Sequence, residues 1–306
     1  MAIITGITAE RMQEYMNENV VTGSINEMGN LILVTRDGTQ IDAGSSIPTV
    51  PIASDIQAGR VELADDTEAA ASTATDKALT PANLKAIPGN RLMQTVRYTS
   101  SGIFTKGSFP MAKAIRVRLV GGGGGGGAGR PATTGQHSSG GGGGGGAYAE
   151  KWITVASLAA TETVTVGAGG AGTSTQGTAG GTTTFGSHCG AGGGGGGNTA
   201  SAQTVLVIAL GGTPGVALSG DLLINGGAGH HGLGYATLGI GGEGGTSQLG
   251  GSGMGSGGPS GAGAYPGGVG QGYGGGGGGS AQNQDAAGVT NGANGAPGIV
   301  LVDVFA

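Results

Sequence analysis

Four uninterrupted runs of glycine constrain the fold of this chain more than any other feature. They occupy residues 121–127, 140–146, 192–197 and 274–279, and glycine makes up 76 of the 306 residues. Ordering a glycine costs about 0.5–1 kcal/mol more backbone entropy than ordering an alanine. A folded structure must offset that cost, and close contact between backbones is available because glycine has no Cβ to hold neighbouring chains apart.

Two architectures allow such close contact. The first packs left-handed helices of three residues per turn side by side, with N–H to C=O bonds between neighbours, and the second is a β-structure laced with glycine. A collagen triple helix is excluded because residues 233–239 break the Gly-x-y repeat that it requires. Since the chain holds only one Trp, six Tyr and four Phe, a large core of bulky side chains is not available. We predict a mainly β fold with polyglycine-II-like segments.

Short apolar segments bracket and interrupt the glycine runs. Residues 115–120 alternate, so that Arg116 and Arg118 face away from the apolar side chains. Further strands are predicted at residues 151–155, 161–166, 182–185, 204–210 and 299–305. Because residues 204–210 are nearly all apolar, we expect that strand to be buried on both faces. The glycine runs should leave this β-scaffold and return, with surface turns at residues 130–139, 198–203, 229–240, 246–266 and 280–294.

The first part of the chain predicts a short helix and a hairpin, neither of which would be stable in isolation. Residues 8–16 place Met12, Tyr15 and Met16 at helical spacing after the N-cap candidate Thr8. A helix this short is marginal in water, so we expect it to dock on a partner rather than on its own chain. Residues 30–42 predict a hairpin turning at Asp37-Gly38. A lone hairpin is barely stable, which favours three copies around an axis and hence a homotrimer.

Residues 48–94 predict a linker and a small mixed module. Two prolines hold residues 47–51 extended. A short strand should follow, then a turn of helix capped by Asp65 and Asp66, and then a second helix that begins at Thr80 and Pro81.

Several classes of function are excluded by what the sequence lacks. The net charge of −5 and the absence of a basic patch exclude nucleic acid as a partner. No apolar run approaches the roughly 20 residues of a membrane span, so we expect no membrane insertion. The adjacent pairs His188-Cys189 and His230-His231 are poorly spaced for a metal, and Cys189 is more readily a small buried residue than a nucleophile. The carboxylates are scattered, so we expect no enzyme, no metal site and no cofactor.

Aromatic side chains in glycine-rich turns are the best candidates for recognition. Tyr235, Tyr265 and Tyr273 lie in such turns, with His230 and His231 nearby. Aromatic faces stack on sugars, and their limited rotamer freedom lowers the entropic cost of contact. The alternative is that these side chains only pin the loops in place.

Two stretches resemble known proteins. Residues 53–87 contain G-R-V-E-L-A-D-D-T-E-A and D-K-A-L-T-P-A-N-L, and they resemble a module found along many bacteriophage tail fibres. The second stretch is residues 95–306. It contains Y-T-S-S-G-I-F-T-K at residues 98–106, I-R-V-R-L-V directly before the first glycine run, and G-A-P-G-I-V-L-V near its end. This part is similar to the glycine-rich C-terminal domain of phage tail fibre proteins and to the polyglycine-sandwich adhesins of some fibre tips.

The resemblance implies a division into three parts: a tail-attachment helix and hairpin at residues 1–47, a stalk module at 48–94 and a glycine-rich tip domain at 95–306. It implies a tail fibre, made in the host cytoplasm and carried on the virion tail. Met12, Tyr15 and Met16 would contact other tail or baseplate proteins. Loops of the last part would bind a bacterial surface glycan or an outer-surface protein.

Two other functions stay open from the sequence. The protein could be a structural collar or fibre component that touches no receptor. An enzyme that degrades surface polysaccharide would need paired carboxylates in a groove. The glycine-rich part offers only scattered candidates: Glu150, Glu162, Asp221, Glu243, Asp285 and Asp303.

Overall fold

The computed structural model describes residues 20–25, 30–45, 62–71, 77–81, 83, 91–257 and 262–306. The chain divides into two compact units, Met1–Leu84 and Lys85–Ala306. The described residues are mainly β with very little helix, as predicted. The predicted helix at residues 8–16, with Met12, Tyr15 and Met16, lies outside the described residues, and so do residues 47–51 of the linker.

An antiparallel meander forms the first described part of the first unit. Its strands are β1 (Val20–Ile25), β2 (Asn30–Thr35) and β3 (Gln40–Ser45), in that order. The predicted hairpin is confirmed between β2 and β3. Gly38 has a φ of 85°, a conformation that favours glycine, and the carboxylate of Asp37 accepts the backbone N–H of Thr39 at 3.1 Å.

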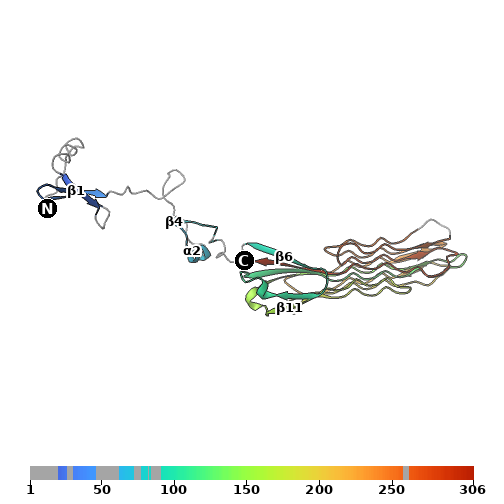
Figure 1. Ribbon diagram of the computed structural model, residues 1–306. Coiled ribbons are helices and arrows are strands. Elements are labelled where there is room, and N and C mark those ends of the chain that lie inside the picture. The colour runs from blue at the N-terminus through green and yellow to red at the C-terminus, as the bar shows by residue number, and fades with distance from the viewer. Residues whose placement is uncertain are drawn as a thin grey trace, which may run out of the picture. The chain divides into compact units, whose positions relative to one another are not determined.

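A small α/β element follows in the same unit. The strands β4 (Glu62–Leu63) and β5 (Lys77–Ala78) pair in parallel, and the helix α2 (Asp66–Ala71) lies between them in the sequence (Figure 1). Asp65 caps the helix, since its carboxylate accepts the N–H of Glu68 at 2.8 Å while Glu68 accepts the N–H of Asp65 at 3.0 Å. Of the predicted second helix, only Thr80, Pro81 and Asn83 lie within the described residues.

Two five-stranded antiparallel sheets form a sandwich in the second unit. The first sheet has the order β16 (Leu222–Ile224), β10 (Tyr148–Thr154), β8 (Ala114–Val120), β21 (Ile299–Phe305) and β6 (Leu92–Tyr98). The second has the order β15 (Ala217–Ser219), β13 (Cys189–Ala191), β12 (Thr183–Phe185), β11 (Thr161–Thr165) and β7 (Gly102–Thr105). Short 3-10 turns follow β7 at Lys106–Ser108 and β10 at Val155–Ser157.

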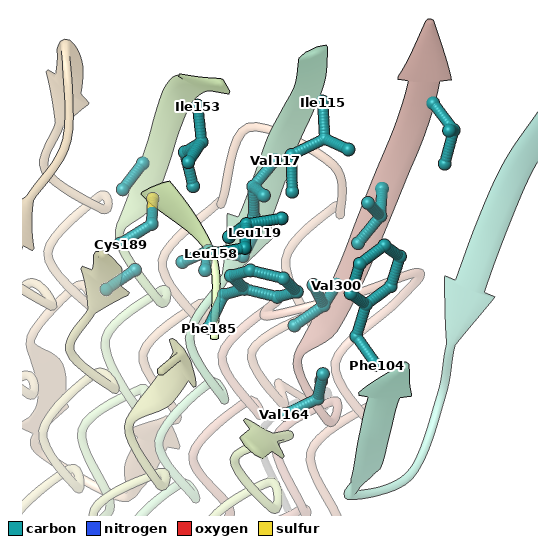
Figure 2. Close-up of a cluster of buried hydrophobic side chains, with 14 of the residues drawn as sticks. Phe104, Ile115, Val117, Leu119, Ile153, Leu158, Val164, Phe185, Cys189 and Val300 are labelled. Atoms are coloured by element: carbon teal, nitrogen blue, oxygen red, sulfur yellow. The ribbon is translucent and has the colours of Figure 1, made fainter. Parts of the chain in front are cut away.

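The core of the sandwich lies between these sheets (Figure 2). The inward side chains of β8, Ile115, Val117 and Leu119, are fully buried, as their alternation with Arg116 and Arg118 predicts. They face Phe185 of β12 and the other buried side chains of the second sheet. Burying each such side chain stabilises the fold by roughly 1.5–3 kcal/mol. The core holds few aromatic side chains, and the sandwich accounts for only one end of the unit.

Long extended segments, which we call threads, run from the sandwich to the opposite end of the unit and back (Figure 1). The outward threads are residues 121–127, 167–173, 192–198, 225–231, 250–256 and 274–280. The return threads are residues 140–147, 177–183, 210–216, 241–247, 266–272 and 291–298. The predicted departure and return of the glycine runs is therefore confirmed.

The threads bond to one another with a period of three residues. In thread 121–127, the N–H of Gly121 donates to thread 140–147, that of Gly122 to thread 177–183, and that of Gly123 to thread 291–298. The same order of acceptor threads then repeats from Gly124. Three other threads donate to its carbonyl groups. A β-strand directs its bonds to two sides only, whereas this thread has neighbours on all sides.

Three threads, residues 121–127, 140–147 and 274–280, are buried along their whole length, and the others surround them. On the surrounding threads an exposed side chain recurs at every third position, as Leu210, Thr213 and Val216 illustrate. The interior positions leave no room for side chains. A Cβ built on Gly124 would lie 2.0 Å from the carbonyl oxygen of Gly195.

Two expectations about individual segments are wrong. Only Val207–Ala209 (β14) of the predicted strand 204–210 is a strand, and Leu206, Ile208 and Leu210 are exposed rather than buried. The physical reason is that β14 is the outermost strand of its sheet. Residues 246–266 do not form one surface turn, because they include a turn next to the sandwich, the thread 250–256 and part of the opposite end.

Candidate binding tip

The end of the threads away from the sandwich, which we call the tip, carries two small antiparallel sheets. The first has the order β14, β17 (Gly232–Tyr235) and β18 (Leu238–Ile240). The second has the order β19 (Ala264–Tyr265), β20 (Ala281–Gln282) and β9 (Ser138–Ser139). Their strands come from five separate inserts between threads, which the lattice of threads brings together.

Glycine allows the two tip sheets to approach closely. Along β17 the residues alternate between buried glycine, at Gly232 and Gly234, and exposed Leu233 and Tyr235. A Cβ on Gly234 would lie 2.1 Å from Cδ2 of His137, which precedes β9. The inner face of the first tip sheet is therefore made of backbone, and its large side chains point outward.

His137 holds the tip from inside. Its side chain is completely buried, and Nδ1 lies 2.5 Å from the carbonyl oxygen of Ala236. Ala236 is in the turn between β17 and β18 and has a φ of 54°, which is strained for a residue with a Cβ. Within the described part of the chain, Nε2 of His137 has no hydrogen-bond partner. No local sequence pattern indicates this role.

Replacing Gly234 with Ala should detach the first tip sheet without unfolding the sandwich. The new methyl group would overlap the ring of His137, which has no space to move because it is buried. We expect amide exchange to accelerate at residues 232–240 and to stay slow in β8, measured by hydrogen exchange with mass spectrometry. The control is Gly257→Ala, where a Cβ meets nothing within 4 Å. Equal exchange in both variants would contradict the close approach of the tip sheets.

A shallow cleft of about 460 Å³ opens at the tip between two inserts. Its lining consists of Pro131, Ala132, Thr133, Thr134, Asp285, Ala286 and Ala287. Thr134 donates to the carboxylate of Asp285 at 2.7 Å. Asp285 has a φ of 57°, so its backbone is held in an uncommon conformation. The sequence predicted both inserts as surface turns, but it carried no signal that they would pair.

The tip gathers most of the candidate residues for recognition. Tyr235 is 72% exposed, and Tyr265 is half-buried in β19. His230 and His231 are exposed where thread 225–231 enters the tip. His230 Nδ1 lies 3.7 Å from a carboxylate oxygen of Glu243, whereas His231 Nδ1 accepts the backbone N–H of Gly211 at 2.9 Å.

Tyr273 lies apart from the other candidates. It is half-buried next to the sandwich, where it packs against Val120, Tyr148 and Ile299. A thread of seven residues, 274–280, separates it from the tip, and at about 3.1 Å per residue this is roughly 22 Å. These contacts fit the alternative given in the sequence analysis, in which a tyrosine only holds its turn in place.

A family model described as a glycine-rich domain matches residues 99–305. The chain belongs to this glycine-rich domain family. The match spans the sandwich, the threads and the tip together, so the glycine-rich domain is nearly the whole of the second unit. No curated protein matches the chain.

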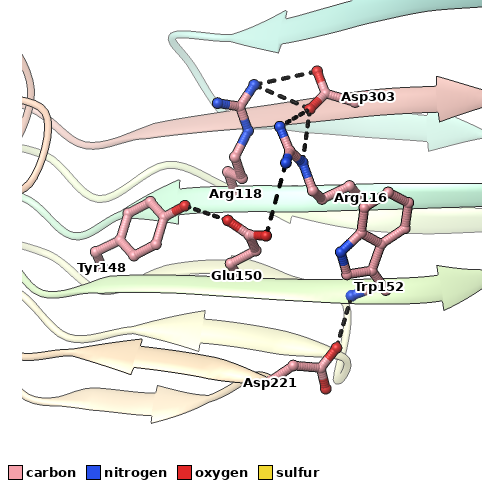
Figure 3. Close-up of polar contacts among 7 residues, drawn as sticks. All are labelled: Arg116, Arg118, Tyr148, Glu150, Trp152, Asp221 and Asp303. Atoms are coloured by element: carbon pink, nitrogen blue, oxygen red, sulfur yellow. Dashed lines mark hydrogen bonds and ion pairs between the residues drawn. The ribbon is translucent and has the colours of Figure 1, made fainter. Parts of the chain in front are cut away.

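A cluster of polar side chains lies on the first sheet of the sandwich (Figure 3). Asp303 of β21 is only 3% exposed and receives Arg116 at 3.1 Å and Arg118 at 3.0 Å, both from β8. Thr95 of β6 donates to the same carboxylate at 2.7 Å. These four residues tie three neighbouring strands together. Because its oxygens are engaged and shielded, the carboxylate of Asp303 does not reach a ligand from solvent.

A second carboxylate extends this cluster to β10. Glu150 accepts the hydroxyl of Tyr148 at 2.7 Å and lies 4.0 Å from Arg116, whose guanidinium stacks over Trp152. Burial, and then the bond to Glu150, raise the pKa of Tyr148 far above its usual value. Tyr148 is buried, whereas Trp152 is half exposed. The arrangement is that of a sheet-stabilising ion-pair network.

The remaining reactive groups are enclosed or dispersed. Cys189 is buried in the sandwich core, and burial raises the pKa of its thiol to about 12, so it stays protonated at neutral pH. His188 lies 3.1 Å from a carboxylate oxygen of Glu162. In the described part of the chain, no three metal-binding side chains gather, and no helix has the length and apolar character needed to cross a membrane.

Proposed function

We propose that this protein is a bacteriophage tail fibre or tail-tip protein whose glycine-rich domain contacts the bacterial surface. The observation that carries the proposal is the gathering of five inserts at the tip, at the far end of the threads from the sandwich. The tip holds a cleft and exposed aromatic and histidine side chains. Loops supported by a rigid scaffold are where binding residues usually lie.

Polyglycine-II-like packing is part of the same proposal. It is supported by the three-residue period of the bonds and by the absence of room for a Cβ on the interior threads. Threads packed in this way would hold the tip at a fixed distance from the sandwich. That rigidity would lower the entropic cost of ordering the tip when it binds.

The rest of the chain would attach the glycine-rich domain to the particle. Residues 1–47 would dock on other tail or baseplate proteins through Met12, Tyr15 and Met16, and residues 48–94 would form a stalk. Copies would assemble as a homotrimer on the virion tail. This part of the proposal is supported by the confirmed hairpin at Asp37-Gly38 and by the small size of the sheet that contains it.

The receptor chemistry that fits the tip is neutral rather than strongly anionic. Residues 198–240 contain no Lys or Arg, and Arg130 is the one cation of the neighbouring insert. Tyr235 and Tyr265 offer faces for a sugar ring, and the cleft offers Thr133 and the carboxylate of Asp285 for hydroxyl groups. Each contact would be weak, and several tips on one particle would multiply the binding.

Binding of the labelled full-length chain to a panel of bacterial cells and purified surface glycans tests this function. On a cell that binds the wild type, Tyr235→Ser and Asp285→Asn should each weaken binding by about tenfold, the loss of one good contact. The control is Met254→Ser, which removes a side chain of similar exposure, 75%, from a thread. Equal binding by all the variants would count against the tip as the contact site.

The rival function is a structural fibre component with no receptor contact. The exposed aliphatic side chains of residues 205–224 favour it, because they suit packing against protein. Labelling the tip with gold and imaging the particle would separate the two functions. A tip directed away from the tail supports receptor contact, and a tip packed against tail proteins supports the rival.

A further inference from the structure

One long flank of the glycine-rich domain exposes aliphatic side chains from the sandwich to the tip. We define this flank as the exposed apolar surface of residues 205–233, which supply the neighbouring threads 210–216 and 225–231 and strands at both ends. The two threads are joined by the bond from Gly229 N–H to Gly212 O at 2.9 Å. The exposed aliphatic side chains at the tip include Leu206, Ile208 and Leu233, and those at the sandwich include Leu218, Leu222 and Leu223.

The flank also carries unpaired edges. The strands β14, β15 and β16 are each the outermost strand of a different sheet, and all three come from this one stretch of chain. Natural proteins protect such edges by keeping the edge strands short, as these three-residue strands are, and by placing charged side chains on them. This flank has a single charged residue, Asp221, and it is already engaged, because its carboxylate accepts the backbone N–H of Trp152 at 2.9 Å.

The fold of one copy does not need these side chains. At the tip, glycine rather than leucine forms the inner face of the sheet. Exposed apolar side chains gathered along one flank in this way mark an interaction site, whereas isolated exposed leucines are ordinary.

We propose that this flank is the interface between copies of the same chain, packed side by side along their threads. This inference rests on the proposed assembly of copies and names the surface that joins them. The apolar ends of the flank are separated by threads of seven residues, roughly 22 Å. A partner that covers both ends must therefore extend over more than this distance, and another copy, which has the same threads between the same two ends, does so. Because the flank is nearly uncharged, two copies meet without like-charge repulsion.

Crosslinking of the full-length chain tests the interface. Ala228→Cys places a thiol midway along the flank, and the native Cys189 is too buried to compete. A short bismaleimide should join Ala228→Cys chains into covalent oligomers. Ala168→Cys, exposed on thread 167–173, is the matched control and should give none. Absence of crosslinks through Ala228→Cys, or equal crosslinking at both sites, would overturn the proposal.

Substitution of the flank provides the second readout. Adding Leu218→Asp to Ala228→Cys should lower the crosslinking yield by about tenfold, because a carboxylate would be buried in an apolar contact. Val269→Asp is the matched control, since Leu218 and Val269 are 57% and 56% exposed. Unchanged circular dichroism would show that each copy remains folded. An unchanged crosslinking yield with Leu218→Asp would overturn the proposal. It would mean that the copies meet through another surface, or that a different protein covers the flank.

Cell binding is measured on the same samples. Crosslinking without cell binding would keep the flank as the interface and remove the proposed receptor role. Cell binding by chains that do not crosslink would keep the receptor role and remove the flank interface.

Discussion

Substitution of Gly143 by Ala should lower the free energy of unfolding of the glycine-rich domain by about 3 kcal/mol or more, at the upper end of the range for overpacked cores. Gly143 lies in an interior thread, and a Cβ there would be 2.2 Å from the carbonyl oxygen of Gly124. That oxygen is backbone, so it cannot rotate aside as a flexible side chain could. The threads would have to separate and lose bonds such as that from Gly143 N–H to Gly277 O at 2.8 Å.

Chemical unfolding followed by circular dichroism measures this loss. The matched control is Gly251→Ala on a surrounding thread, where the nearest atom to a Cβ, in Gln271, is 3.7 Å away. This variant should be neutral or more stable by about 0.4–1 kcal/mol, because alanine restricts the unfolded chain. If the two variants were equally stable, contact between backbones would not be what holds the interior threads together.

Substitution of Asp303 by Asn should destabilise the sandwich by about 2–3 kcal/mol, less than the 3–5 kcal/mol typical of a fully buried pair. Asp303 is the shared partner of Arg116 and Arg118, so Arg118 would lose its carboxylate and Arg116 would keep only the 4.0 Å contact with Glu150. The arginine side chains remain 32% and 28% exposed, so water compensates part of the loss.

Thermal unfolding of the same samples tests the cluster. The control is Asp221→Asn, which alters one carboxylate bonded to one backbone N–H. We expect that change to cost about 1 kcal/mol or less. An Asp303→Asn variant as stable as Asp221→Asn would mean that the network adds little to the sandwich.

The local structure of the sandwich could be predicted from the sequence, but the arrangement of the threads could not. Alternation in residues 115–120 places Ile115 inside and Arg116 outside, and the structure confirms both. The partner of each thread is a different problem, because consecutive glycines are identical and offer no side chain that distinguishes one register from the next. Only the few residues between runs, together with the strands at the ends, fix which threads meet.

Prediction from the sequence was also limited at the tip. The sequence identified Tyr235 and Tyr273 as aromatic side chains in glycine-rich turns, but it could not tell that Tyr235 is exposed at the tip while Tyr273 packs next to the sandwich. Burial of residues 204–210 was predicted wrongly because apolar composition normally means a core position, and here a glycine face takes that place. The position of His137 beneath Gly234 depends on two inserts nearly a hundred residues apart, so no local pattern could reveal it.

The position of β21 between β8 and β6 has a consequence for how the protein is made. Thr95 and Asp303, which are bonded across β6 and β21, are 208 residues apart in sequence. While a ribosome is still translating the threads, the strand that must join β8 to β6 does not yet exist. The nascent chain therefore waits with an open sheet until almost all of the domain has emerged, and contacts of such long range close slowly.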